Sequence, residues 1–154
     1  MILSNEYIRG LIDGEGCFSF CTVPISKKVE DKVIRQKVPA FLLNMHVRDK
    51  DLVQSVRDHL GLRNRVYQYR STPLHGHKKS YKRGDKVLLI VRDLGQLKNN
   101  IVPFFYGRLR GYKGKQFNTW LENIGNDPEV IDDYRLIFRL YKSGWFDKNP
   151  KFLD

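Results

Sequence analysis

The stretch YIRGLIDGEGCFSF, residues 7–20, constrains the fold more than any other part of this sequence. Apolar residues recur at helical spacing from Tyr7 to Ile12, and Ser4 is placed to cap a helix over residues 5–13. Residues 17–23 then alternate between aromatic and small or polar side chains, which predicts a half-buried strand. No linker separates the two elements, so the helix must feed directly into a sheet.

Two glycines on this helix predict a contact with another helix. Gly10 and Gly14 are four residues apart and therefore lie on one helix face, where small residues allow two backbones to approach closely. No later segment offers a matching glycine stripe. The simplest partner is the same helix of a second copy, with Tyr7 and Leu11 completing a two-fold interface.

The helix ends in two carboxylates, Asp13 and Glu15, each followed by a glycine, Gly14 and Gly16. In a symmetric dimer the two copies of Glu15 would lie close together, which is costly unless cations neutralise them. A hard divalent ion such as Mg²⁺, or Mn²⁺, accepts carboxylate oxygens and helix-terminal carbonyls, here that of Gly14. The alternative is that the carboxylates only cap neighbouring groups and the glycines only make a tight turn.

The charge of the chain indicates a polyanionic partner. Among 154 residues, 28 Lys and Arg face 17 Asp and Glu, giving a net charge of +11. This balance favours nucleic acid, with a ribosomal-type protein or a merely basic domain as alternatives. The length fits a single domain over residues 1–154. We expect no membrane segment, no signal peptide and an intracellular protein, in the cytoplasm, the nucleoid or an organelle.

The remaining chain alternates strands and helices. We expect a polar loop at 24–32, strands at 33–47, 63–70 and 86–93, and helices at 49–60, 94–108 and 114–124, with a last helix from Glu129 onward. Pro39 predicts an edge position or a bulge in its strand. The order predicts an α+β domain with an antiparallel sheet that buries one face and presents the other.

Basic and aromatic side chains gather on the predicted hairpins, and β-ribbons of this kind can enter the major groove of DNA. The candidate base or phosphate contacts on strands are Arg35, Lys37, Arg63, Arg65, Tyr67 and Tyr69. The candidate phosphate contacts in loops are Lys27, Lys28, Lys78, Lys79, Lys82 and Arg83.

The motif IRGLIDGEG at residues 8–16 resembles, position by position, the signature of the LAGLIDADG homing endonucleases. The stretch at 102–124 is similar to a later segment of that family, in which a Pro-Phe pair precedes a basic run and a helix. The resemblance implies an αββαββα core with a saddle-shaped antiparallel sheet and C-terminal helices. It also implies a site-specific, metal-dependent double-strand DNA endonuclease that acts as a homodimer on a long pseudo-palindromic target.

The resemblance implies roles for individual residues. Glu15 matches the acidic metal ligand, with the carbonyl of Gly14 as a second ligand, and Asp13 matches an earlier acid that braces the helix junction. Lys113 aligns with the basic residue near the scissile phosphate, and Lys115 follows the same local pattern. A lysine there can stabilise the charge that develops on the phosphate.

One position departs from the family pattern. Met45 stands where many members place a glutamine that orders water, and a thioether accepts hydrogen bonds only weakly. His46 or Arg48 is a candidate substitute, or the metal ions alone could hold the water. The alternative for His46 is a strand histidine that faces solvent or DNA. The departure keeps two other functions open, an RNA maturase that binds intron RNA and a non-catalytic DNA-binding protein.

Overall fold

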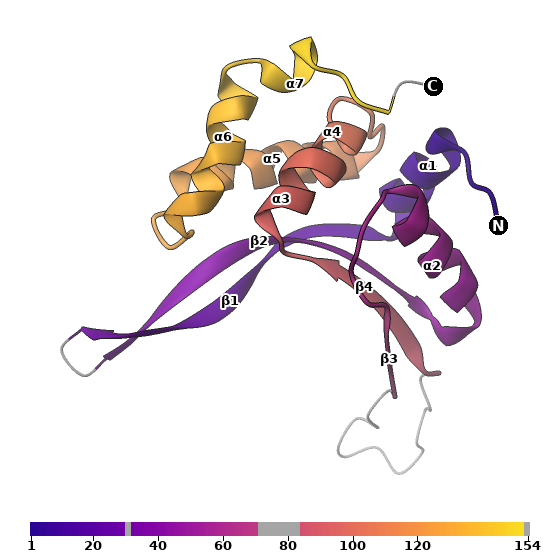
Figure 1. Ribbon diagram of the computed structural model, residues 1–154, viewed down its shortest axis with the longest axis horizontal. Coiled ribbons are helices and arrows are strands. Elements are labelled where there is room, and N and C mark those ends of the chain that lie inside the picture. The colour runs from indigo at the N-terminus through magenta and orange to yellow at the C-terminus, as the bar shows by residue number, and fades with distance from the viewer. Residues whose placement is uncertain (30–31, 71–83, 153–154) are drawn as a thin grey trace.

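The computed structural model describes residues 1–29, 32–70 and 84–152. Four strands form one antiparallel sheet in the order β1-β2-β4-β3. Figure 1 shows this sheet as an arch with the helices above it, which confirms the predicted α+β architecture. The elements are α1 (Asn5–Glu15), β1 (Gly16–Val29), β2 (Lys32–His46), a 3₁₀ turn (Val47–Asp49), α2 (Lys50–His59), β3 (Tyr67–Tyr69), β4 (Lys86–Val91), α3 (Leu94–Gln96), a π-helical turn (Leu97–Ile101), α4 (Val102–Phe105), α5 (Tyr112–Asn126), a second 3₁₀ turn (Asp132–Tyr134), α6 (Arg135–Lys142) and α7 (Trp145–Lys148).

Helix α1 begins as its sequence predicts and continues through Glu15, two residues beyond the predicted end. The Ser4 hydroxyl accepts a hydrogen bond from the Tyr7 N–H at 3.1 Å. Gly16 turns the chain into β1, and a Cβ there would collide with the Ile12 side chain and lie 3.0 Å from the Ile12 carbonyl oxygen. The junction between helix and strand therefore requires a glycine.

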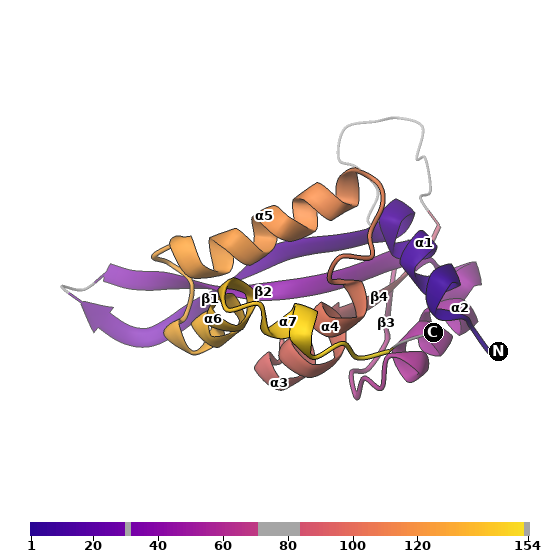
Figure 2. The ribbon, with the colours of Figure 1, turned by 90° about the horizontal axis from the view of Figure 1, so that it is seen from above.

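Aromatic rings fill the space between the sheet and the helices. The ring of Phe18 in β1 lies 5.5 Å from that of Phe41 in β2, 4.9 Å from that of Phe117 and 5.3 Å from that of Trp120, measured between centroids. Trp120 also donates its indole N–H to the Ser19 carbonyl at 2.8 Å. Figure 2 shows α5 running along the β1–β2 hairpin. These contacts fix α5 on the sheet.

Two strand boundaries differ from the prediction. The polar loop expected at 24–32 is wrong. Strands β1 and β2 remain paired there, with Pro24 opposite Arg35 and Lys28 opposite Val33, and the register shifts between these two pairs. This ribbon extends beyond the helices, so no buried face imposes the alternation that reveals a strand. The strand expected at 63–70 is shorter and comprises only β3. The residues before it make other hydrogen bonds, because the Asn64 side chain donates to the Ile90 carbonyl and the Arg63 N–H donates to the Gln96 side-chain oxygen.

The C-terminal helix starts six residues later than predicted, because the preceding segment pairs with β2. The Lys37 N–H donates to the Glu129 carbonyl at 2.8 Å, and the Ile131 N–H donates to the Lys37 carbonyl at 3.1 Å. Helix α6 then begins at Arg135. The predicted edge position of Pro39 is confirmed. Strand β4 pairs with β2 only over Phe41–His46, so Pro39 has no partner on β4.

We expect the stability of this docked segment to depend on pH through Asp127, which pairs with Lys37. The Glu129 N–H and the Lys37 ammonium lower the pKa of Asp127 below its ordinary 3.8. Its contribution to stability is therefore present above pH 4 or so and is lost as the pH falls through the lowered value. We expect Asp127→Asn to lower the free energy of unfolding at pH 7 and the difference from wild type to shrink toward pH 2. Urea unfolding at several pH values measures this, and a difference independent of pH would contradict it.

Candidate active site and nucleic-acid interface

Asp13 joins the end of α1 to the start of α5. Its two carboxylate oxygens accept hydrogen bonds from the Arg110 N–H at 3.1 Å and the Gly111 N–H at 3.2 Å. Gly111 is the residue that precedes α5, so the carboxylate lies at a helix N-terminus, where unpaired N–H groups and the helix dipole favour a negative charge. The two backbone hydrogen bonds hold two segments together that are almost 100 residues apart in sequence.

Glu15 and Lys113 each lie two residues beyond this link. Glu15 is the exposed last residue of α1, and Lys113 is a half-buried residue in the first turn of α5. Within the described part of the chain, neither side chain makes a hydrogen bond or an ion pair. The Glu15 carboxylate on α1 and the Lys113 ammonium on α5 are therefore available to a ligand, on either side of the hydrogen bonds that Asp13 accepts.

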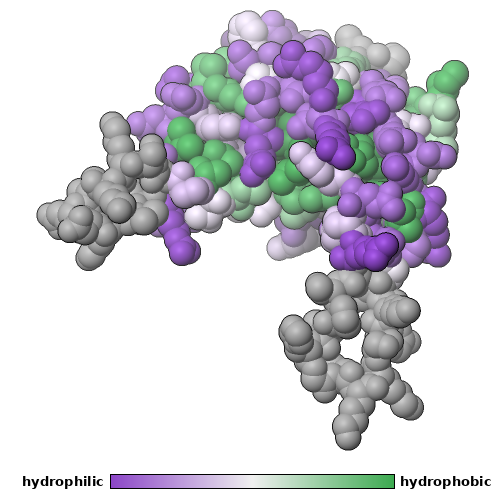
Figure 3. Space-filling model, turned by 60° about the horizontal axis from the view of Figure 1, so that its bottom comes forward, coloured by the Kyte–Doolittle hydropathy of each residue, from purple (hydrophilic) through white to green (hydrophobic). Residues whose placement is uncertain are grey.

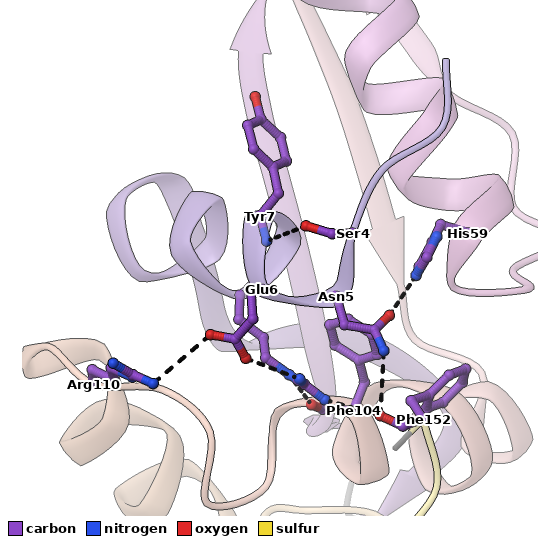
Figure 4. Close-up of polar contacts among 9 residues, drawn as sticks. Ser4, Asn5, Glu6, Tyr7, His59, Phe104, Arg110 and Phe152 are labelled. Carbon is purple, nitrogen blue, oxygen red and sulfur yellow. Dashed lines mark hydrogen bonds and ion pairs between the residues drawn. The ribbon is translucent and has the colours of Figure 1, made fainter. Parts of the chain in front are cut away.

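A second polar link, which sequence reasoning missed, anchors the covered side of α1. Glu6 lies 3.8 Å from the Arg110 guanidinium and 3.3 Å from that of Arg9. Arg9 is only 3% exposed and donates to the Phe104 carbonyl at 3.1 Å. In Figure 4, Glu6 points toward Arg110, while Asn5 lies between His59 and Phe152. The sequence signal for Arg9 was a charged residue placed between two buried isoleucines.

The opposite side of α1 is open. A Cβ built on Gly10 or Gly14 would meet no atom within 4 Å, and Tyr7 is 49% exposed. Leu11 is half-buried beside them. The glycine face predicted for a second copy is therefore uncovered by the described residues.

Met45 and His46 lie at the end of β2 and are held by packing. Met45 packs against the core. The His46 Nδ1 accepts from the Arg48 N–H at 3.1 Å, and its Nε2 lies where a Cβ on Gly84 would be. This placement favours a structural role for His46, because one ring nitrogen is hydrogen-bonded and the other packs against the backbone.

The face of the sheet away from the helices carries several of the predicted nucleic-acid contacts. Tyr67 and Tyr69 are exposed there, and Tyr69 shares a hydrogen bond of 2.7 Å with Asn44. The Arg65 guanidinium lies 5.6 Å from the centroid of the Tyr67 ring, and Arg63 is exposed. These side chains leave donors and aromatic rings available to a ligand on the open face.

Other predicted contacts are placed differently. Lys37 is an ion-pair partner of Asp127 at 3.0 Å and Glu129 at 3.2 Å, which favours a role at the sheet edge over the predicted contact to DNA. Arg35 is exposed on the ribbon. Lys115 lines a groove of about 540 Å³ between β1 and α5. Outside the described residues lie Lys78, Lys79, Lys82 and Arg83, while the side chains of Lys27 and Lys28 are likewise not described.

The donor set near Glu15 fits a shared rather than a self-contained metal site. No group of three or more His, Cys, Asp or Glu side chains that could hold a metal occurs among residues 1–29, 32–70 and 84–152. Mg²⁺ is commonly held by one or two carboxylates together with substrate phosphates and water. The Glu15 carboxylate and the Gly14 carbonyl would be the protein ligands of such a site.

The fold is an arched antiparallel sheet with helices on one face and an open opposite face, and the first helix ends in a carboxylate. These features define a sheet-based α+β protein with a candidate nucleic-acid interface. The sequence model of the family described as LAGLIDADG endonuclease matches residues 8–124, and the chain belongs to this family. No match to a curated protein was found. Among the helices in the described part of the chain, none is long and apolar enough to cross a membrane.

Solved structures share the fold. The I-CpaMI meganuclease bound to uncleaved DNA matches with a TM-score of 0.61 and 14% identity, over 97% of this chain and 46% of that one. The I-LtrWI homing endonuclease bound to target DNA matches with a TM-score of 0.58 and 23% identity, over 78% of this chain and 36% of that one. I-TnaI, a homing endonuclease, matches with a TM-score of 0.55 and 18% identity, over 93% of this chain and 99% of that one. The chain thus spans less than half of the first two and nearly all of the third.

Proposed function

We propose that this protein is a site-specific double-strand DNA endonuclease that requires Mg²⁺ or Mn²⁺. The observation that carries the proposal is the Asp13 carboxylate, whose hydrogen bonds to Arg110 and Gly111 join the end of α1 to the start of α5, the two helices that carry Glu15 and Lys113. Family membership and the DNA-bound homing endonucleases of the same fold support it. Residues 1–154 would act as one domain, because one buried cluster extends from Ile8 to Phe146.

Each residue has a distinct task in the proposed reaction. Glu15 and the Gly14 carbonyl would hold the divalent ion, which supplies Lewis-acid polarisation of the phosphate and a more acidic water. Lys113 would stabilise the negative charge that develops on the phosphate oxygens. Asp13 would remain a positioning residue, because its carboxylate is already committed to two backbone N–H groups. Tyr67, Tyr69, Arg63, Arg65, Arg35 and Lys115 would bind the duplex.

A single copy holds one Glu15, so cutting both strands calls for two copies, and we propose a homodimer through Tyr7, Gly10, Leu11 and Gly14. We expect Gly10→Leu to convert the dimer into a folded monomer. The new side chain meets nothing within the chain, and leucine favours a helix by about 1 kcal/mol over glycine, so folding is not impaired. In the dimer the same side chain would separate the helix backbones.

Sedimentation equilibrium and thermal unfolding of Gly10→Leu test this interface. Arg139→Leu on the exposed side of α6 is the matched control, which should keep the wild-type mass. A variant that stays dimeric with an unchanged dissociation constant would contradict the proposed interface.

Cleavage of a plasmid library carrying candidate insertion sites tests the activity itself. We expect linear product with Mg²⁺ and none with EDTA. Met45 packs against the core, and a thioether cannot order water as a glutamine does. This is the observation that supports the two other functions, an RNA maturase and a non-catalytic DNA-binding protein. Tight binding of DNA or intron RNA without cleavage at any site would favour a maturase or a DNA-binding protein. Either substrate implies an intracellular location.

A further inference from the structure

Three apolar side chains meet at the centre of the open sheet face. In β4 every second residue, Val87, Leu89 and Val91, is fully buried beneath the helices, and the intervening Leu88 and Ile90 therefore point to the other face, where they are half-buried. Leu42 of β2 pairs directly with Ile90, and Asn44 pairs with Leu88. Side chains paired in this way lie about 5 Å apart, so Leu42, Leu88 and Ile90 form one contiguous apolar patch.

Cationic and aromatic groups surround this patch. Arg65, Tyr67, Ile90 and Arg92 line one hollow of about 230 Å³ at the side of the sheet, together with Asn64 and one acid, Asp93. Lys86 precedes the patch on the same face of β4, so the basic side chains here outnumber the acid. Figure 3, which brings the underside of the arch forward, shows hydrophobic surface interleaved with hydrophilic surface. An occupant that complements this face is anionic at its edges and offers apolar groups at its centre.

We propose that Leu42, Leu88 and Ile90 recognise the C5-methyl groups of thymines in the major groove. This inference rests on the proposed function, since it takes double-stranded DNA as the ligand. Thymine alone among the four bases presents a methyl group in that groove, and apolar side chains contact it. The same side chains leave the hydrogen-bonding edges of other bases without partners, which is costly in a desolvated contact.

The strand spacing also fits the spacing of base pairs. Residues two apart on one face of an antiparallel strand are separated by about 6.8 Å, and two base-pair steps advance by about 6.8 Å. Leu88 and Ile90 on one strand can therefore contact methyl groups two base pairs apart. We expect each half of the preferred target to contain thymines at this interval, on either DNA strand.

Selection from a randomised duplex library, carried out in EDTA so that no strand is cut, gives the preferred sequence. Each enriched thymine is then replaced by uracil, which removes only the methyl group. For the wild-type protein we expect affinity to fall about fourfold at each of two thymines, the effect of exposing one methyl-sized group. Ile90→Gln should lose this dependence at one thymine and Leu88→Gln at the other. Lys86→Gln is the matched control and should weaken both duplexes equally.

The outcomes separate this inference from the proposed function. Enrichment of a defined duplex that binds equally well with uracil overturns the methyl contact and leaves DNA recognition intact. Variants that keep the full difference between thymine and uracil also overturn it, provided that their thermal unfolding shows them folded. If no duplex is enriched at all, the proposed DNA target fails, and this inference fails with it.

Discussion

Glu15→Gln is expected to lower the cleavage rate by about 10³-fold or more, the scale seen when one electrostatic group of an active site is lost. Glutamine keeps the size of the side chain and removes the charge that would hold a divalent ion. Because Glu15 is exposed and makes no hydrogen bond or ion pair with the described residues, its replacement leaves the packing of α1 unchanged. DNA affinity in EDTA should be equal to that of wild type or higher, since one negative charge near the phosphates is gone.

Single-turnover cleavage and binding, measured on the same duplex, check this result. Asp133→Asn is the matched control, because it removes a carboxylate that is also exposed but lies before α6, away from the site. The control should cut at the wild-type rate. Near-normal cleavage by Glu15→Gln would contradict the assignment of Glu15 as a metal ligand and would point to another acid.

Asp13→Ala is expected to lower the cleavage rate by 10-fold to 100-fold and the free energy of unfolding by about 2 kcal/mol. The stability loss follows from a charge-assisted capping interaction at the start of α5. The rate loss follows because the helices that carry Glu15 and Lys113 lose the hydrogen bonds that join them, and a displacement of about 1 Å can cost a factor of 10². DNA affinity should change little, since the open sheet face is untouched.

Rate and stability must be separated in this experiment. Tyr134→Phe provides the comparison, because it removes a hydrogen bond to the Arg92 carbonyl at a distance from the site. Both variants are assayed well below their unfolding temperatures. If Tyr134→Phe loses as much cleavage as Asp13→Ala at a similar loss of stability, Asp13 acts only through stability. Asp13→Asn, which keeps one carbonyl oxygen as an acceptor, should give an intermediate rate.

The motif helix shows how far local pattern reasoning extends. Its cap at Ser4, its apolar stripe and its glycine junction all follow from residues within one or two turns of each other, and all are present. The same reasoning failed for the β1–β2 ribbon, which has no buried face to impose alternation, and for residues 129–131, which pair with β2 and not within a helix. It also named Lys37 as a candidate DNA contact without the ion pairs to Asp127 and Glu129, which come from a distant segment of the chain.

By itself the sequence determined the motif helix, its acidic end, the basic character of the chain and the family to which it belongs. Those features depend on neighbours along the chain, whose spacing is fixed by helix and strand geometry. Only the tertiary structure decided which polar side chains make hydrogen bonds or ion pairs and which have no partner among the described residues. Asp13 meets Gly111, and Arg9 meets Phe104, across nearly 100 residues, because burial in one core brings these segments together. The family resemblance already distinguished Asp13 from Glu15, but the two backbone hydrogen bonds that commit the Asp13 carboxylate exist only in the folded chain.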